Sequence, residues 1–172
     1  MLRILGILVI IAGSSGCALA VVRERAAYLE RCRSWRELLR LMENEIAFQK
    51  SSLPEICARA GRHLTGNKRD FLDRIGRALE EDGGETLGEI WRREARLIFR
   101  REPVKKEIEM EVEELGGRLC FEDGDLMRKI LKEAEGYIRK HQEEQERISR
   151  EKNKLTLCAG VMGGLLLTIL LL

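Results

Sequence analysis

The chain has 172 residues, with 31 lysine and arginine residues against 29 aspartate and glutamate residues and a formal net charge of +2. This near balance argues against nonspecific binding of nucleic acid driven by overall charge. The charges are unevenly placed, because Arg3 is the only one outside residues 23–154. The chain therefore has two apolar ends around a highly charged middle.

The two apolar ends, residues 4–22 and 155–172, contain no charged side chain. Each is close to the roughly 20 residues that a helix needs to cross a bilayer. Basic residues cluster directly after the first segment and directly before the second, whereas the opposite side has only Arg3. Because such residues favour the cytoplasmic side, we expect two transmembrane helices in the cell membrane, with residues 23–154 in the cytoplasm and both termini, including residues 1–3, outside.

The stretch GSSGCALA inside the first apolar segment allows two other interpretations. Ala18 and Ala20 have the small-x-small spacing of a signal-peptide cleavage site, and Cys17 could carry a lipid. A signal peptide usually has a more basic start than one arginine, and Ser14 stands where a lipid site usually has leucine. We favour a retained anchor and keep cleavage or lipidation as the alternatives.

Small residues in both apolar segments predict close packing of helices. Gly160 and Gly164 form a GxxxG motif, and the first segment contributes Ala12, Gly13 and Gly16. Such residues let helix backbones approach one another in a membrane. The alternative is that glycine is simply frequent in spanning helices.

The charged middle has helical apolar spacing nearly throughout. Its first stripe advances by steps of four and three residues and consists of Tyr28, Cys32, Trp35, Leu39, Met42 and Ile46. Ser52 followed by Glu55 predicts a capping box, with Pro54 in the first turn of the next helix. Further apolar patterns predict helices over residues 53–64, 71–79, 87–98 and 104–115, and from about Asp123 into a charged stalk.

One of these helices is ambiguous, because residues 107–113 alternate strictly between glutamate and an apolar residue, which is a strand pattern. We favour a helix, since Glu and Met are good helix formers and the flanking apolar spacing continues at four and three. Pro103 would open this helix and Gly116-Gly117 would close it. The predicted fold is all-α, with two transmembrane helices flanking an antiparallel six-helix cytoplasmic bundle.

The sequence offers no set of residues for catalysis. It lacks the GxxxxGK[ST], GxSxG and HExxH motifs. The only histidines are His63 and His141, and no zinc-ligand spacing can be assembled from them and the cysteines. We therefore expect no enzyme activity, no catalytic, cofactor or metal site, and five cysteines that act as small apolar residues rather than disulfide partners: Cys17, Cys32, Cys57, Cys120 and Cys158.

The most basic cluster away from the apolar ends is RREARLIFRR, residues 92–101. Charge runs are usually a solvated helix face. The functional alternative is a docking surface for an acidic protein partner, and nucleic acid is disfavoured because no RNA-binding signature is present. The candidate partner-binding residues are Arg92, Arg93, Arg96 and Arg100.

Several local patterns resemble the stage III sporulation protein AB family of endospore-forming bacteria. The resemblance covers MLRILG at the start, LLRLMENEIAFQKSSLPEI over residues 38–56, LGGRLCFED over residues 115–123, and KLTLCAGVMGGLLLTILLL at the end. In the third stretch Gly117 replaces the usual glutamate and Cys120 replaces the second glycine. In the second stretch, the positions close to the family pattern are Leu38, Leu41, Glu45, Ile46, Phe48, Leu53 and Pro54.

The resemblance implies a membrane component of the channel-like complex that links mother cell and forespore. It also implies similarity to the platform proteins of type II secretion and type IV pilus systems, whose helical cytoplasmic domains are served by a hexameric ATPase. On this basis we expect a non-enzymatic platform in the mother-cell membrane around the forespore. Its expected partners are that ATPase, other membrane subunits of the complex and further copies of itself. The alternative is a membrane-tethered helical adaptor or sensor unrelated to secretion.

Overall fold

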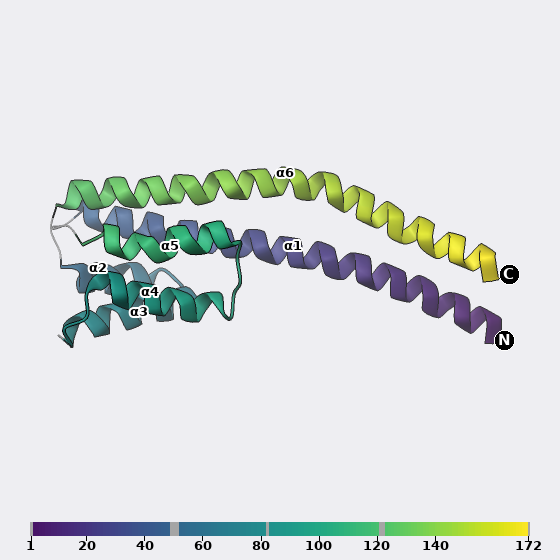
Figure 1. Cartoon of the computed structure of the whole chain (residues 1–172), viewed down its shortest axis with the longest axis horizontal. Helices are drawn as coiled ribbons and strands as arrows, with labels where there is room; N and C mark the ends of the chain where they lie inside the picture. Colours follow the sequence, from purple (N-terminus) through teal and green to yellow (C-terminus); the bar gives the residue numbers. More distant parts are fainter. Residues whose placement is uncertain (1, 49–51, 82, 121–122, 172) are drawn as a thin grey trace. The chain divides into compact units, whose positions relative to one another are not determined.

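The computed structural model describes residues 2–48, 52–81, 83–120 and 123–171, and for most residues near the two ends it describes the backbone helix alone. The described residues form six α-helices and no strand, which confirms the all-α class (Figure 1). The helices are α1 (Leu2–Phe48), α2 (Leu53–Arg62), α3 (Gly66–Glu80), α4 (Leu87–Phe99), α5 (Lys106–Arg118) and α6 (Gly124–Leu171).

The chain divides into two compact units. One unit consists of Glu30–Gln142 and contains α2 to α5 with the adjoining parts of α1 and α6, while the other consists of Met1–Leu29 and Glu143–Leu172. Among the described residues, no helix combines the length and hydropathy needed to span a bilayer. The expected spans at residues 4–22 and 155–172 fall mainly on residues whose side chains lie outside the described part of the chain.

The predicted packing residues Ala12, Gly13, Gly160 and Gly164 also lie outside the part whose side chains are described, so the close-packing hypothesis stays a prediction. Gly16 is described and exposed. A Cβ added to Gly16 would meet no other described atom within 4 Å.

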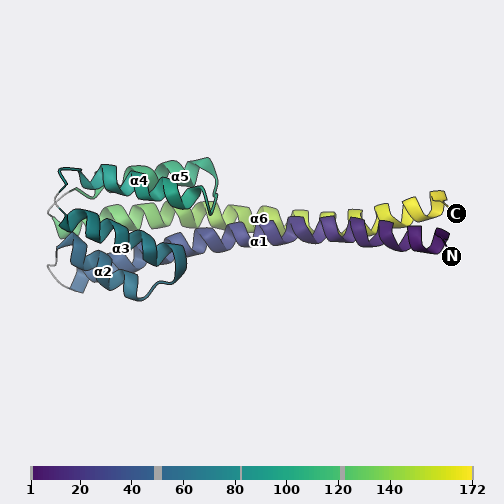
Figure 2. The ribbon, with the colours of Figure 1, turned by 90° about the horizontal axis from the view of Figure 1, so that it is seen from below.

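Within residues 30–142, the short helices form two hairpins beside α1 and α6. Helix α2 packs on α3, and α4 packs on α5, while α3 also contacts α4 (Figure 2). The guanidinium of Arg36 on α1 lies 2.8 Å from the Glu135 carboxylate on α6, and Arg36 also donates a hydrogen bond of 2.9 Å to the Gln142 amide oxygen. These contacts join the two longest helices, although Glu135 and Gln142 are 99 and 106 residues away from Arg36 in the sequence.

The apolar stripe predicted on α1 lies in the core. Its four central residues, Cys32, Trp35, Leu39 and Met42, are fully buried, while Tyr28 and Ile46 at its ends are partly exposed. An apolar side chain at every third or fourth position faces one direction of a helix, and this spacing explains why the stripe is buried as a unit.

Aromatic side chains link four helices at the centre of this unit. Trp35 lies 5.3 Å from Phe71 and 5.4 Å from Phe99, measured between ring centroids, and Phe71 lies 4.9 Å from Trp91. Two of these pairs are edge-to-face, an arrangement that aromatic quadrupoles favour. The Trp91 indole N–H donates to the carbonyl of Val112 at 2.7 Å, so it is satisfied inside the core.

The ambiguous segment of residues 107–113 is helical, and the alternative of a strand is wrong. Ile108, Val112 and Leu115 are fully buried on one face of α5, while the glutamates between them lie at the side or in solvent. The spacing of four and three therefore outweighs the local alternation, because only a helix can bury all three residues together.

The expectation that Gly116-Gly117 closes α5 is also wrong, because the helix continues to Arg118. The two glycines lie instead where α5 crosses α4. A Cβ added to Gly116 would come within 3.0 Å of the Trp91 side chain, and one added to Gly88 would lie 3.1 Å from the Cα of Gly117. Gly116 and Gly88 therefore have a packing role, because a side chain at either position would keep the two helices from approaching this closely.

We predict that Gly116→Ala destabilises the chain by about 1–3 kcal/mol, since the added methyl group would force Trp91 out of its core position. Gly117→Ala is the matched control, because nothing lies within 4 Å of a Cβ added there among the described residues. Denaturant unfolding of the full chain, followed by circular dichroism, measures both variants. Equal stabilities for the two variants would contradict this role of Gly116.

Candidate protein-docking surface on helix α4

The four candidate arginines are gathered on the exposed side of α4. Arg92, Arg93 and Arg96 lie within the helix and Arg100 is its C-cap residue, and all four are exposed. The opposite side is buried and includes Leu87, Ile90, Trp91, Ala95 and Ile98. The structure therefore brings together all four residues that the sequence predicts for partner binding.

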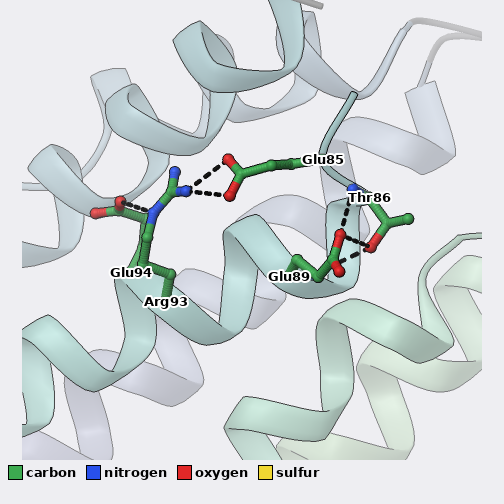
Figure 3. Close-up of polar contacts among 5 residues, drawn as sticks. All are labelled: Glu85, Thr86, Glu89, Arg93 and Glu94. Atoms are coloured by element: carbon green, nitrogen blue, oxygen red, sulfur yellow. Dashed lines mark hydrogen bonds and ion pairs between the residues drawn. The ribbon is translucent and has the colours of Figure 1, made fainter. Parts of the chain in front are cut away.

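The start of α4 is fixed by a capping box that the sequence analysis missed. The Thr86 hydroxyl accepts a hydrogen bond from the Glu89 N–H at 3.4 Å, and the Thr86 N–H donates to the Glu89 carboxylate at 2.8 Å (Figure 3). The backbone hydrogen bond from Thr86, joined by one from its hydroxyl, lowers the pKa of Glu89. The Thr-x-x-Glu spacing was a sequence signal for this box.

The expected capping box at the start of α2 does not form. Ser52 is the N-cap residue and Pro54 lies in the first turn, as predicted, but the Ser52 side chain makes no capping hydrogen bond. Pro54 has no backbone N–H, so one of the donors that a cap would serve is absent from this turn.

Arg93 is held by carboxylates from within the chain. Its guanidinium donates to both Glu85 oxygens, at 2.6 and 2.5 Å, and lies 3.3 Å from the Glu94 carboxylate (Figure 3). The hydrogen bonds with Glu85, followed by those with Glu94, raise the pKa of Arg93. Arg93 and Glu85 are each close to half exposed, so the pair remains open to solvent.

Glu94 is a buried acid inside the basic run, and the sequence analysis did not single it out. It is 5% exposed and pairs with Arg74 of α3 at 2.6 Å as well as with Arg93. Carboxylates are seldom buried unless they are paired. Glu94 therefore links α4 to α3 through Arg74, and it also pairs with Arg93 of the arginine cluster.

Of the remaining arginines, Arg96 lies 3.0 Å from the Glu113 carboxylate on α5. Arg92 and Arg100 form no ion pair among the described residues, although Arg92 lies close enough to influence the charge of Glu89. Leu97 is 43% exposed on the same helix. The surface thus has two arginines that are paired within the chain, Arg93 and Arg96, and two that are not, Arg92 and Arg100. It also has one exposed apolar side chain.

We predict that Thr86→Ala destabilises the chain by about 1 kcal/mol, because the N-terminus of α4 loses its side-chain cap. Ser52→Ala is the matched control at another N-cap and should cost clearly less, since Ser52 makes no capping hydrogen bond. Urea titrations of both variants give the comparison. A larger loss from Ser52→Ala would show that the capping box is not the important contact.

The cysteines do not provide a reactive centre in the described core. Cys32 and Cys57 are buried, whereas Cys120 and Cys158 are exposed, and none of these four forms a disulfide bond. Burial, with a smaller contribution from the nearby charge of Asp73, raises the pKa of Cys57 to about 12. This thiol stays protonated at neutral pH and is therefore a poor nucleophile. No group of His, Cys, Asp and Glu suited to a metal ion occurs among the residues that the structure describes.

The fold and this surface define an all-helical domain whose most distinctive exposed feature is a set of arginines on one helix. The family model for stage III sporulation protein AB matches residues 3–172, so the chain belongs to that family.

The fold is also that of a solved structure titled "Stage III sporulation protein AB (SpoIIIAB)". The match has a TM-score of 0.63 and 16% sequence identity, and it covers 72% of this chain and 97% of the solved chain. At this identity the likeness concerns the fold alone. A search of curated protein sequences found no match.

Proposed function

We propose that the chain is a non-enzymatic membrane platform of the complex that links mother cell and forespore, and that its helical domain docks the complex's secretion-type ATPase. The observation that carries the docking proposal is the α4 surface, where Arg92 and Arg100 have no ion pair among the described residues and flank the exposed Leu97. Membership of a sporulation family supports the setting. The chemistry of the surface calls for an acidic partner with a small apolar contact.

The internal ion pairs support a docking role for α4 because they prepare the surface. Arg93 and Arg96 are oriented by Glu85 and Glu113, so a partner would order fewer flexible side chains on binding. Arg92 and Arg100 lie eight residues apart, which is about 12 Å along a helix. We propose that these two form the direct contacts and that the held pair shapes the surface between them.

Exposed apolar side chains near the chain ends support the membrane part of the proposal. Leu19 is 48% exposed, Val21 is 42% exposed and Met162 is 61% exposed. Removing such side chains from water is favourable by about 25 cal/mol per Å² of apolar surface. Together with the uncharged stretches of sequence around them, they favour insertion in lipid. The basic residues that flank these stretches on the side of residues 23–154 favour the cytoplasmic side, so we propose both termini outside and residues 23–154 in the cytoplasm.

The topology is tested by reporter fusions at each end and in the α2–α3 hairpin of the full chain. We expect a reporter that works only in the cytoplasm to be active when fused in the hairpin, and a reporter that works only outside the cell membrane to be active when fused at either end. Cys17→Ser should leave the protein in the membrane and change its mass only by the exchange of sulfur for oxygen, because a retained anchor carries no lipid. A central domain found outside the cytoplasm, or release of the Cys17→Ser variant, would contradict the proposal.

The docking surface is tested by co-purification of the ATPase with the full chain. Arg92→Glu together with Arg100→Glu should lower capture by about tenfold or more, because like charges would then face an acidic partner. The matched control is Arg62→Glu with Arg77→Glu, which changes the net charge equally at exposed sites on α2 and α3. Equal capture by both variants, or undiminished capture by a chain that lacks residues 23–154, would reject docking at this surface.

A further inference from the structure

A shallow, open hollow with a basic lining lies along one face of α1, on a different helix from the arginine cluster of α4, and is called the α1 groove below. It is lined by Arg33, Arg36, Glu37, Arg40, Leu41 and Asn44. Arg36 is fixed by its contacts with Glu135 and Gln142. The other two arginines are less constrained. Arg33 pairs only with the neighbouring Glu30, and both of these side chains are more than 60% exposed. Arg40 forms no ion pair among the described residues. Such exposed pairs contribute little to stability, so Arg33 can exchange its partner.

A ridge of opposite charge lies on α5. Glu107 and Glu114 are exposed and form no ion pair among the residues described. Between them Met110 is 49% exposed. These three residues follow the spacing of three and four that places side chains on one side of a helix.

The α1 groove and the α5 ridge match in the sign and spacing of their charges, and each also carries one apolar side chain. Arg33 and Arg40 are seven residues apart, as are Glu107 and Glu114, and seven residues span about 10 Å of helix. Leu41 gives the groove an apolar side chain, and Met110, which adapts well to irregular surfaces, gives the ridge another.

We propose that these two surfaces bind one another between copies of this chain, with the α5 ridge of one copy in the α1 groove of the next. The occupant is a second copy because the same chain carries both complementary halves. Since the two halves are different surfaces, the contact is head-to-tail and generates a ring or an open row of subunits. The contact uses none of the four α4 arginines of the docking surface proposed above.

Charge exchange in the full chain, purified in detergent and studied by sedimentation velocity, tests the proposal. The wild-type chain should self-associate with rising concentration, and less so at high salt, because salt screens exposed charges. Arg33→Glu with Arg40→Glu, and separately Glu107→Arg with Glu114→Arg, should each weaken self-association by about tenfold or more. The variant Arg62→Glu with Arg77→Glu should associate like the wild type.

The decisive sample mixes the two weakened variants. The acidic groove of the Arg33→Glu, Arg40→Glu variant can then bind the basic ridge of the Glu107→Arg, Glu114→Arg variant. The wild-type ridge of the first variant can bind the wild-type groove of the second, so association should return. This recovery also shows that both variants are folded. A wild-type chain that stays monomeric at all concentrations, variants that associate normally, or a mixture that fails to associate would each overturn the proposal. The groove variant keeps its α4 arginines, so it should still capture the ATPase. This measurement distinguishes a failure of self-association from a failure of the docking surface on α4.

Discussion

The domain of residues 30–142 depends on the contact of Trp35 and Trp91 with the same ring, that of Phe71. This arrangement brings α1, α3 and α4 to one point, and Phe99 of α4 also contacts Trp35. Helix α5 joins through the hydrogen bond from Trp91 to the Val112 carbonyl. Large aromatic side chains bury much apolar surface at little conformational cost, so a few of them can organise a small helical core.

A buried lysine ties the loop between α4 and α5 to this cluster. The Lys68 ammonium lies 4.3 Å from the centre of the Trp35 ring and 2.8 Å from the Glu102 carboxylate. Burial lowers the pKa of Lys68. Burial would raise the pKa of Glu102, but hydrogen bonds from Lys68 and Asn67 and nearby positive charges outweigh it and lower that pKa. With the hydrogen bond from Arg31 to the Pro103 carbonyl, these contacts hold the loop between α4 and α5 against α1 and α3.

Periodicity in the sequence was sufficient to predict the helices but not the contacts between them. The stripe from Cys32 to Met42 depends only on helix geometry, so it could be read directly. The role of Gly116 depends on the position of Trp91, which is set by another helix. Lys68 and Glu94 look like ordinary surface charges in the sequence, because their partners lie 34 and 20 residues away. The arginines on α4 were predictable as a group, but which of them are held internally was not.

The near balance of charge in the whole chain conceals a separation of charge within one hairpin. Exposed arginines are concentrated on α4 and glutamates on α5, and the Arg96–Glu113 pair joins the two helices where they face one another. Pairing inside the hairpin satisfies the charges at the seam and leaves those on the outer faces available. A chain with little net charge can therefore present separate basic and acidic surfaces, which suits specific contacts with proteins better than general attraction to polyanions.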